Sequence, residues 1–160
     1  YILSLDEKGE VRPFLNSAAY EGAPQFSPTG RYLAYVSDES GQREIYVTAY
    51  PGGGRKWQVS TQGGTHPVWI ADGTQIFYRQ GDAMMAASVR EAGEFTVSKP
   101  RQLFRGNYSY GMGISMANYD VTRDGRRIVM VRDESSAQGS VQVALNWFEE
   151  LRRLSAEAAK

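Results

Sequence analysis

The stretch with the most obvious chemical potential is residues 51–64, PGGGRKWQVSTQGG, in which three glycines precede Arg55, Lys56 and a later Ser60-Thr61 pair. A glycine-rich loop can cradle a phosphate when it leads through a Gly-Lys-Ser/Thr run into a helix, whose amides and dipole then face the anion. Here arginine follows the glycines directly, and a strand-like run, 56–60, stands where the helix would begin. The stretch therefore predicts a turn between two strands and not a nucleotide site.

Residues 113–117, GISMA, come close to the Gly-x-Ser-x-Gly nucleophile elbow of hydrolases. That elbow exposes its serine on a strained turn between a strand and a helix. No strong strand precedes Ser115, and a strand is expected after it, so we interpret the segment as a structural loop. Loss of a measured esterase or peptidase activity in a Ser115→Ala variant would revive the hydrolase hypothesis.

His66, the single histidine, precedes Pro67, and neither a paired acid nor a nucleophile can be recognised for it. It is interpreted as a hydrogen-bonding or packing residue, and is kept as a candidate ligand contact. One histidine and no cysteine exclude a histidine-rich metal site, thiolate metal sites and disulfides. We predict neither a metal nor a cofactor.

The charge balance narrows the range of partners. The chain of 160 residues carries 18 Lys and Arg against 18 Asp and Glu, which gives no electrostatic case for nucleic acid or an anionic membrane. No apolar run approaches the roughly 20 residues that span a bilayer, so membrane insertion of this chain is not expected. Residues 1–5 are typical of a strand interior, and no signal peptide is recognised, so the chain is expected to begin within a larger design.

The candidate residues described above are expected to lie on β-strands and the turns between them. Short β-branched and aromatic runs bounded by turn residues favour an all-β fold, either a sandwich, a barrel or a propeller. The expected strands after residue 23 include 31–37, 43–50, 55–60, 67–70, 74–79, 84–89, 94–97, 101–104, 119–122, 126–132 and 141–145.

An internal repeat separates these fold classes. Residues 24–35 recur as 67–78 and again as 119–130, and their turn glycines, Gly30, Gly73 and Gly125, are 43 and then 52 residues apart. A period of about 40–45 residues with four strands in each unit is typical of a β-propeller. The glycine has a physical reason, because a tight connection between strands needs a residue at positive φ.

The repeat also resembles a known family. SPTG followed by RYLAYVSDESGQREIYV resembles the TolB-like, WD40-like (PD40) β-propeller repeat, with Thr29 in place of the usual aspartate. The later segments PGGGRKWQVSTQGGTHPVWIADGTQIFYR, PRQLFRG, NYDVTRDGRRIVMV and VQVALNWFEELRRL resemble, in order, the C-terminal part of propellers attached to bacterial transmembrane serine/threonine kinases and related sensors. A kinase's Gly-rich loop and His-Arg-Asp loop are missing, so kinase activity does not carry over.

Together these patterns predict a partial β-propeller of about three four-stranded blades over residues 1–154. Two leading strands lie within 1–15, and blades follow at 23–60, 66–104 and 118–146, the last without its fourth strand. Asn146 and Glu149 form a capping pattern for a short amphipathic helix, 147–154, expected to dock on the rim, with a partner-binding helix as the alternative. Residues 155–160 are expected to fray.

One long connection is a candidate ligand-binding loop. Residues 105–116, RGNYSYGMGISM, account for the longer third spacing and join two expected blades. Tyrosines offer apolar area with a hydroxyl, and methionines adapt to varied surfaces. The candidate ligand-binding residues are Tyr108, Tyr110, Met112, Met116 and His66.

The strand count predicts self-association, because closed propellers have about four to eight blades and an open one exposes strand edges and apolar faces. Either the chain belongs to a larger propeller, or a homodimer closes a ring as each chain's leading strands complete its partner's unfinished sheet. The preferred function is a non-catalytic binding or scaffolding module that presents loops to a protein, a peptide or a small ligand. The alternative implied by the resemblance is a sensor domain of a signalling protein such as a receptor-type kinase, in a periplasmic or extracytoplasmic location.

Overall fold

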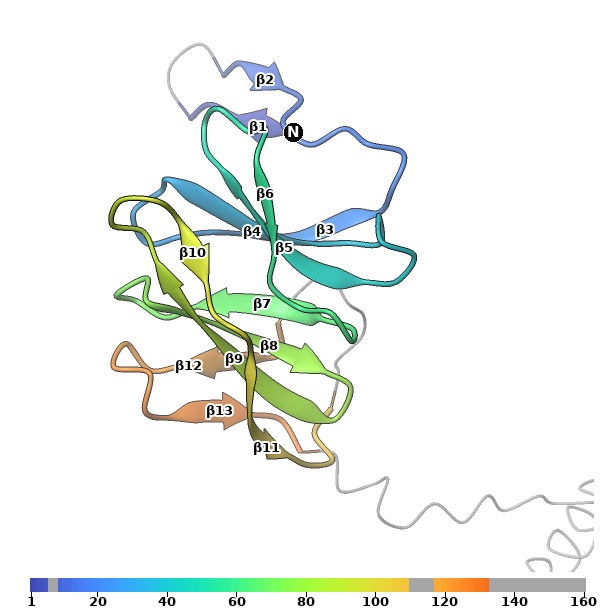
Figure 1. The fold of residues 1–160 in the computed structure, drawn as a ribbon, viewed down its shortest axis with the longest axis vertical. Helices are drawn as coiled ribbons and strands as arrows, with labels where there is room; N and C mark the ends of the chain where they lie inside the picture. Colours follow the sequence, from blue (N-terminus) through green and yellow to red (C-terminus); the bar gives the residue numbers. More distant parts are fainter. Residues whose placement is uncertain (6–8, 110–116, 133–160) are drawn as a thin grey trace, which may run out of the picture.

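The computed structural model describes residues 1–5, 9–109 and 117–132, and over these ranges the protein is all-β (Figure 1). The predicted strand 141–145, helix 147–154 and tail 155–160 lie outside the described residues. The strands are β1 (Ile2–Leu3), β2 (Val11–Arg12), β3 (Glu21–Phe26), β4 (Tyr32–Ser37), β5 (Glu44–Ala49), β6 (Lys56–Gln58), β7 (Thr65–Trp69), β8 (Gln75–Gln80), β9 (Ala83–Arg90), β10 (Thr96–Val97), β11 (Arg101–Arg105), β12 (Tyr119–Val121) and β13 (Ile128–Met130).

The first large sheet is an antiparallel meander in the order β3-β4-β5-β6. Its central strands β4 and β5 are almost wholly buried, which explains why they read as continuous β-branched and aromatic runs. The glycine-rich residues 52–54 form the connection between β5 and β6, as the sequence predicts. The glycine-rich stretch is therefore a connection between two strands of this sheet and does not lead into a helix, as a phosphate-binding loop would.

The second large sheet has five strands, one near each of the five expected runs between 67 and 104, although a blade was expected to have four. It runs β7-β8-β9, and both β10 and β11 pair with β9. β10 pairs with Val89 and Arg90, whereas β11 pairs with the other part of β9, residues 83–86. The reason is the length of β9, whose eight residues leave an edge long enough for two short strands placed end to end.

Two small sheets flank the large ones. β1 pairs with β2 and β12 pairs with β13, both antiparallel. Figure 1 shows the four sheets following one another along the long axis, with β1–β2 at one end and β12–β13 at the other. Over the described residues this is an open stack of sheets, not a closed ring.

Side chains from the first strand of one sheet reach the first strand of the sheet before it. Trp69 Nε1 on β7 donates to the Gln25 carbonyl on β3, at 3.2 Å. Tyr119 on β12 donates its hydroxyl to the His66 carbonyl on β7, at 2.7 Å in a buried setting. Successive sheets are thus joined at their first strands by equivalent kinds of bond.

Two apolar cores fill the spaces between neighbouring sheets. The first lies between the two large sheets and includes Ala34 and Val36 from β4 with Ile76 and Tyr78 from β8. The second, which contains Phe77, lies between the second large sheet and β12–β13. Fully burying one aliphatic side chain stabilises the fold by about 1.5–3 kcal/mol, so inter-sheet packing is the main source of cohesion.

The repeat seen in the sequence has a structural counterpart at its turns. Gly30, Gly73 and Gly125 have φ angles of 69°, 74° and 66°, the left-handed region where a side chain is costly. A second repeated feature was not predicted: Ala23 and His66, at equivalent positions, have φ angles of 50° and 56°. Both lie where the pairing of the first strand with the second shifts register, so the same bulge occurs in both large sheets.

Candidate functional site

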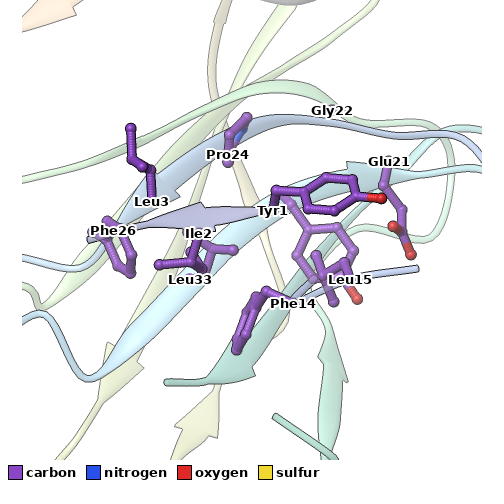
Figure 2. Close-up of a pocket in the computed structure, with 11 residues that line it drawn as sticks. Tyr1, Ile2, Leu3, Phe14, Leu15, Glu21, Gly22, Pro24, Phe26 and Leu33 are labelled. Carbon is purple, nitrogen blue, oxygen red and sulfur yellow. The ribbon is translucent and has the colours of Figure 1, made fainter. Parts of the chain in front are cut away.

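An apolar cavity of about 490 Å³ lies between the N-terminal hairpin and the first large sheet (Figure 2). Figure 2 shows side chains converging on it from β1, from the segment after β2, and from β3 and β4. The residues that line it are Tyr1, Ile2, Leu3, Phe14, Leu15, Glu21, Gly22, Pro24, Phe26, Leu33 and Tyr35. We call this space the N-terminal cavity.

One wall of the N-terminal cavity is a face of the first large sheet. Phe26 on β3 is the cross-strand partner of Leu33 on β4, so their side chains share a face. Tyr35 lies two residues after Leu33 and therefore points to the same side. Leu33 and Tyr35 are buried, but Phe26 keeps 46% of its surface exposed.

The opposite wall comes from the hairpin and covers the sheet only in part. Tyr1 and Leu3 are 82% and 56% exposed although they line the cavity. Tyr50 ties the two walls together, because its ring lies edge-on to Phe14 at 5.4 Å and to Phe26 at 5.0 Å. The cavity is thus open and apolar, and its aromatic rim is held in place.

The electrostatics of the cavity favour apolar contacts over catalysis. Glu21 is the carboxylate of the lining, and it accepts a hydrogen bond from the Ser17 hydroxyl at 2.8 Å. Burial raises the pKa of the Tyr35 phenol, and the carboxylates of Glu39 and Glu21 raise it further, so this phenol stays neutral at physiological pH. In the described residues the Tyr35 hydroxyl has no hydrogen-bond partner. Among the residues that line this cavity, no nucleophile stands beside a base, and most of the side chains are apolar.

A second apolar face lies at the opposite end of the stack. Val129 on β13 is 68% exposed, and Val131 just after it is 57% exposed. The intervening residue, Met130, points to the other side and packs in the second core. The two valines therefore form an uncovered apolar stripe, which we call the β13 stripe.

Of the predicted ligand-binding residues, Tyr108 is described and half-buried. Its ring meets Phe104 edge-on at 5.8 Å, and its carbonyl accepts from Nη2 of the buried Arg79 at 3.3 Å. It lines a cavity of about 560 Å³ between the second large sheet and β12–β13. Tyr110, Met112 and Met116 lie outside the described residues, as does Ser115.

His66 lies within β7 and not in a loop. Its side chain is buried, with 1% of the residue exposed, and its carbonyl accepts from the Tyr119 hydroxyl. It lines a different cavity, of about 470 Å³, formed by the first strands β3, β7 and β12. The structure therefore places His66 and Tyr108, the two described members of the predicted site, in separate cavities.

The later part of the glycine-rich stretch serves a buried polar network. The Glu44 carboxylate accepts from the backbone N–H of Gly63 at 2.9 Å, from Gln42 Nε2 at 2.6 Å and from the Ser60 hydroxyl. Ser60 Oγ in turn accepts from the Ile45 N–H at 2.8 Å. These bonds fix the connection from β6 to β7, so Ser60 and the QGG run have a structural role.

Sequence reasoning did not single out the residues of the N-terminal cavity and the β13 stripe. The signal was available in the repeat, because Phe26, Leu33 and Tyr35 stand where Trp69, Ile76 and Tyr78 stand in the next unit. What the sequence could not show is which of these equivalent faces is covered by a neighbouring sheet.

Comparisons with known proteins do not assign this chain to a family. No protein-family model matches the chain, and no curated protein matches it. In the part of the chain that the structure describes, no group of three His, Cys, Asp or Glu side chains could hold a metal ion. The same described residues include no helix with the length and hydropathy that crossing a bilayer requires.

Proposed function

We propose that the protein is a non-catalytic binding and scaffolding module, a partial β-propeller that self-associates and presents its connecting loops to a protein, a peptide or a small ligand. The large sheets would be blades, and β3, β7 and β12 would be the innermost strands that surround the axis. The hairpin β1–β2 and the pair β12–β13 would be parts of unfinished blades.

The observation that carries this proposal is the repetition of one packing unit along the chain. Both large sheets are antiparallel, the Trp69 bond links β7 to β3, and the Tyr119 bond links β12 to β7. Radial repetition of such units is how propellers protect their strand edges. The N-terminal cavity and the β13 stripe are the places where the repetition stops, and apolar faces of this kind mark interaction surfaces.

The native mass in solution tests the proposal. Sedimentation velocity at micromolar concentration should detect a species with twice the 17.8 kDa mass of the chain, and dilution should shift it toward the monomer. A strictly monomeric chain at tens of micromolar would contradict self-association.

The loop contribution is tested separately on the described residues. Tyr108→Ala is expected to weaken capture of a peptide or small ligand selected against the protein, because it removes the ring that lines the 560 Å³ cavity. Thr96→Ala on β10 is the matched control, since Thr96 is exposed and lies outside that lining. Equal capture by both variants would exclude Tyr108 from the binding surface.

A further inference from the structure

We propose that the N-terminal cavity is filled by β12–β13 of a second copy of this chain, whose β13 stripe packs against Phe26, Leu33 and Tyr35. This inference rests on the proposed self-association and names its interface. In the assembled dimer, the N-terminal hairpin of one copy would extend the sheet that contains β12–β13 of the other. The contact is reciprocal, so each copy both fills a cavity and has its own cavity filled.

The first argument is the equivalence of three sets of residues. Each set has one member on the first strand of a sheet and two on the second, at identical distances from the turn glycine. In each set the first two members are cross-strand partners. The sets are Phe26, Leu33 and Tyr35; Trp69, Ile76 and Tyr78; and Val121, Ile128 and Met130.

Two of these sets are covered by the preceding sheet of the same chain. Trp69, Ile76 and Tyr78 pack in the first core, against the first large sheet. Val121, Ile128 and Met130 pack around the second core, against the second large sheet. The remaining set lines the N-terminal cavity, where Leu33 and Tyr35 are buried and Phe26 stays 46% exposed. Because the other two sets pack against the opposite face of the preceding sheet, we expect the same kind of face to cover this set.

The second argument identifies that opposite face. In the first sheet it carries Ala34 and Val36, and both lie in the first core. In the second sheet the residue equivalent to Ala34 is Phe77, which lies in the second core. In the last sheet the equivalents of Ala34 and Val36 are Val129 and Val131, the β13 stripe, and both are exposed. The stripe therefore stands at the positions of Ala34 and Val36, which pack with Trp69, Ile76 and Tyr78 in the first core, whereas the second sheet has Phe77 and the buried Arg79 there.

The third argument is the inventory of strands. In the described residues β1 has β2 as its paired strand, and β13 has β12. Adding the N-terminal hairpin of one copy to the last sheet of the other would extend that sheet toward the four strands of β3-β4-β5-β6. Unpaired strand edges favour such intermolecular pairing.

A second copy is favoured over another partner because this one chain contains both halves of the interface. The cavity lacks a sheet that presents aliphatic residues at the positions of Ala34 and Val36, and the β13 stripe supplies valines at both. With three units in each chain, reciprocal contacts would make a closed ring of about six, within the range that propellers occupy. A two-fold arrangement satisfies both contacts at once.

Cross-linking provides a direct test, because the native chain contains no cysteine. We would make Phe26→Cys and Val131→Cys, mix the two variants and add a short thiol-specific cross-linker. The proposal predicts a cross-linked dimer containing one chain of each variant, and little product from either variant alone. Thr96→Cys mixed with Phe26→Cys is the control, because Thr96 is exposed on β10, away from both faces.

A charge substitution gives a second measurement that does not depend on cysteine chemistry. Val129→Asp should raise the dimer dissociation constant by on the order of 100-fold, since it forces a carboxylate into an apolar contact. Its melting temperature under monomeric conditions should stay close to that of the native chain, because Val129 is already exposed in the isolated chain. Thr96→Asp is the matched control and should leave the dissociation constant unchanged.

The outcomes separate this inference from the proposed function. A dimer that lacks the mixed cross-link, or that cross-links Val131→Cys to itself, overturns the interface and leaves self-association standing. A monomer at all concentrations overturns both. A monomer whose N-terminal cavity instead binds a small apolar probe, with the probe lost in Phe26→Asp, would show a ligand site in place of the interface.

Discussion

At the residue scale, Gly64 is required for a steric reason. A Cβ at this position would lie 2.3 Å from Ser60 Oγ and 2.8 Å from Ile45 Cγ1, and both neighbours are fixed by the Glu44 network. Overpacking of this kind costs about 1–3 kcal/mol. We expect Gly64→Ala to lower the free energy of unfolding by that amount in urea denaturation.

Gly52 offers a matched comparison within the same glycine-rich stretch. A Cβ there meets nothing within 4 Å, so Gly52→Ala should be neutral or slightly stabilising. If the two variants lose equal stability, close packing around Gly64 is not the cause.

Position 29 holds a threonine where the resemblance implies an aspartate, and the contact with Glu91 explains the difference. Asp72 and Asp124, at the same position in the other turns, accept the backbone N–H two residues ahead, at 2.8 and 3.0 Å. Thr29 Oγ1 also accepts the N–H two residues ahead, from Arg31 at 3.4 Å, and in addition donates its hydroxyl to Glu91 Oε2 at 2.7 Å. An aspartate there would face that carboxylate, and like charges this close are destabilising. We expect Thr29→Asp to lower the free energy of unfolding by about 1 kcal/mol at pH 7.

The double variant isolates the cause of that loss. Combining Thr29→Asp with Glu91→Gln should restore most of the stability in thermal unfolding, because the amide can donate to the new carboxylate. If the double variant loses as much stability as the two single variants added together, Glu91 is not responsible.

At the scale of elements, a buried hydrogen bond links β12 to β7. Tyr119→Phe removes the hydroxyl that donates to the His66 carbonyl and keeps the ring. The expected cost is about 1–2 kcal/mol. Hydrogen exchange should show faster exchange of the β12 and β13 amides, with less change in the first large sheet.

Tyr35→Phe is the control for that variant. The Tyr35 hydroxyl is buried and, among the described residues, has no hydrogen-bond partner. Removing it from the monomer should cost nothing and can stabilise the fold. Equal destabilisation by both variants would mean that the Tyr119 bond does not hold the sheets together.

At the scale of the whole molecule, buried tyrosines predict a loss of stability in alkali. Burial, helped by the nearby Glu44, raises the pKa of Tyr78 from 10.0 to about 12. Burial also raises the pKa values of Tyr35 and Tyr119. Because the folded pKa is above the unfolded one, the folded state holds these protons more tightly. The resulting stability is fully present below pH 10 and is lost as pH rises from 10 through about 12.

Urea unfolding at a series of pH values, followed with phenolate absorbance, checks this prediction. Part of the ten tyrosines should ionise only as the protein unfolds. Tyr78→Phe should flatten the fall in stability between pH 10 and 12. Titration of all tyrosines near pH 10 in a protein that remains folded would contradict the prediction.

Much of the local structure could be predicted because it depends on neighbouring residues. Gly30, Gly73 and Gly125 marked turns that need positive φ, and the structure confirms it. The alternating runs located most strands, and the missing helix context correctly placed residues 52–54 in a β-turn connection. Separate strands were expected at 94–97 and 101–104, but their shared pairing with β9 was not, because it depends on how far β9 extends beyond its neighbours.

The candidate site was harder to predict because its residues are set apart only by the lack of a covering sheet among the described residues. Phe26 and Val129 are apolar, and each lies at the same distance from its turn glycine as residues that a neighbouring sheet covers in other units. The loop residue Tyr108 was chosen for its chemistry, yet it packs beside Phe104 in a cavity separate from that of His66.

By itself the sequence determined the all-β class, the repeated unit and its turns, since strand alternation and left-handed glycines are properties of a few adjacent residues. The packing of the sheets was needed to show which equivalent faces are covered, why Thr29 stands where the other two turns have aspartate, and where His66 lies. Each of these depends on a group brought close from another part of the chain, such as Glu91 or Tyr119, and that proximity arises when the sheets stack.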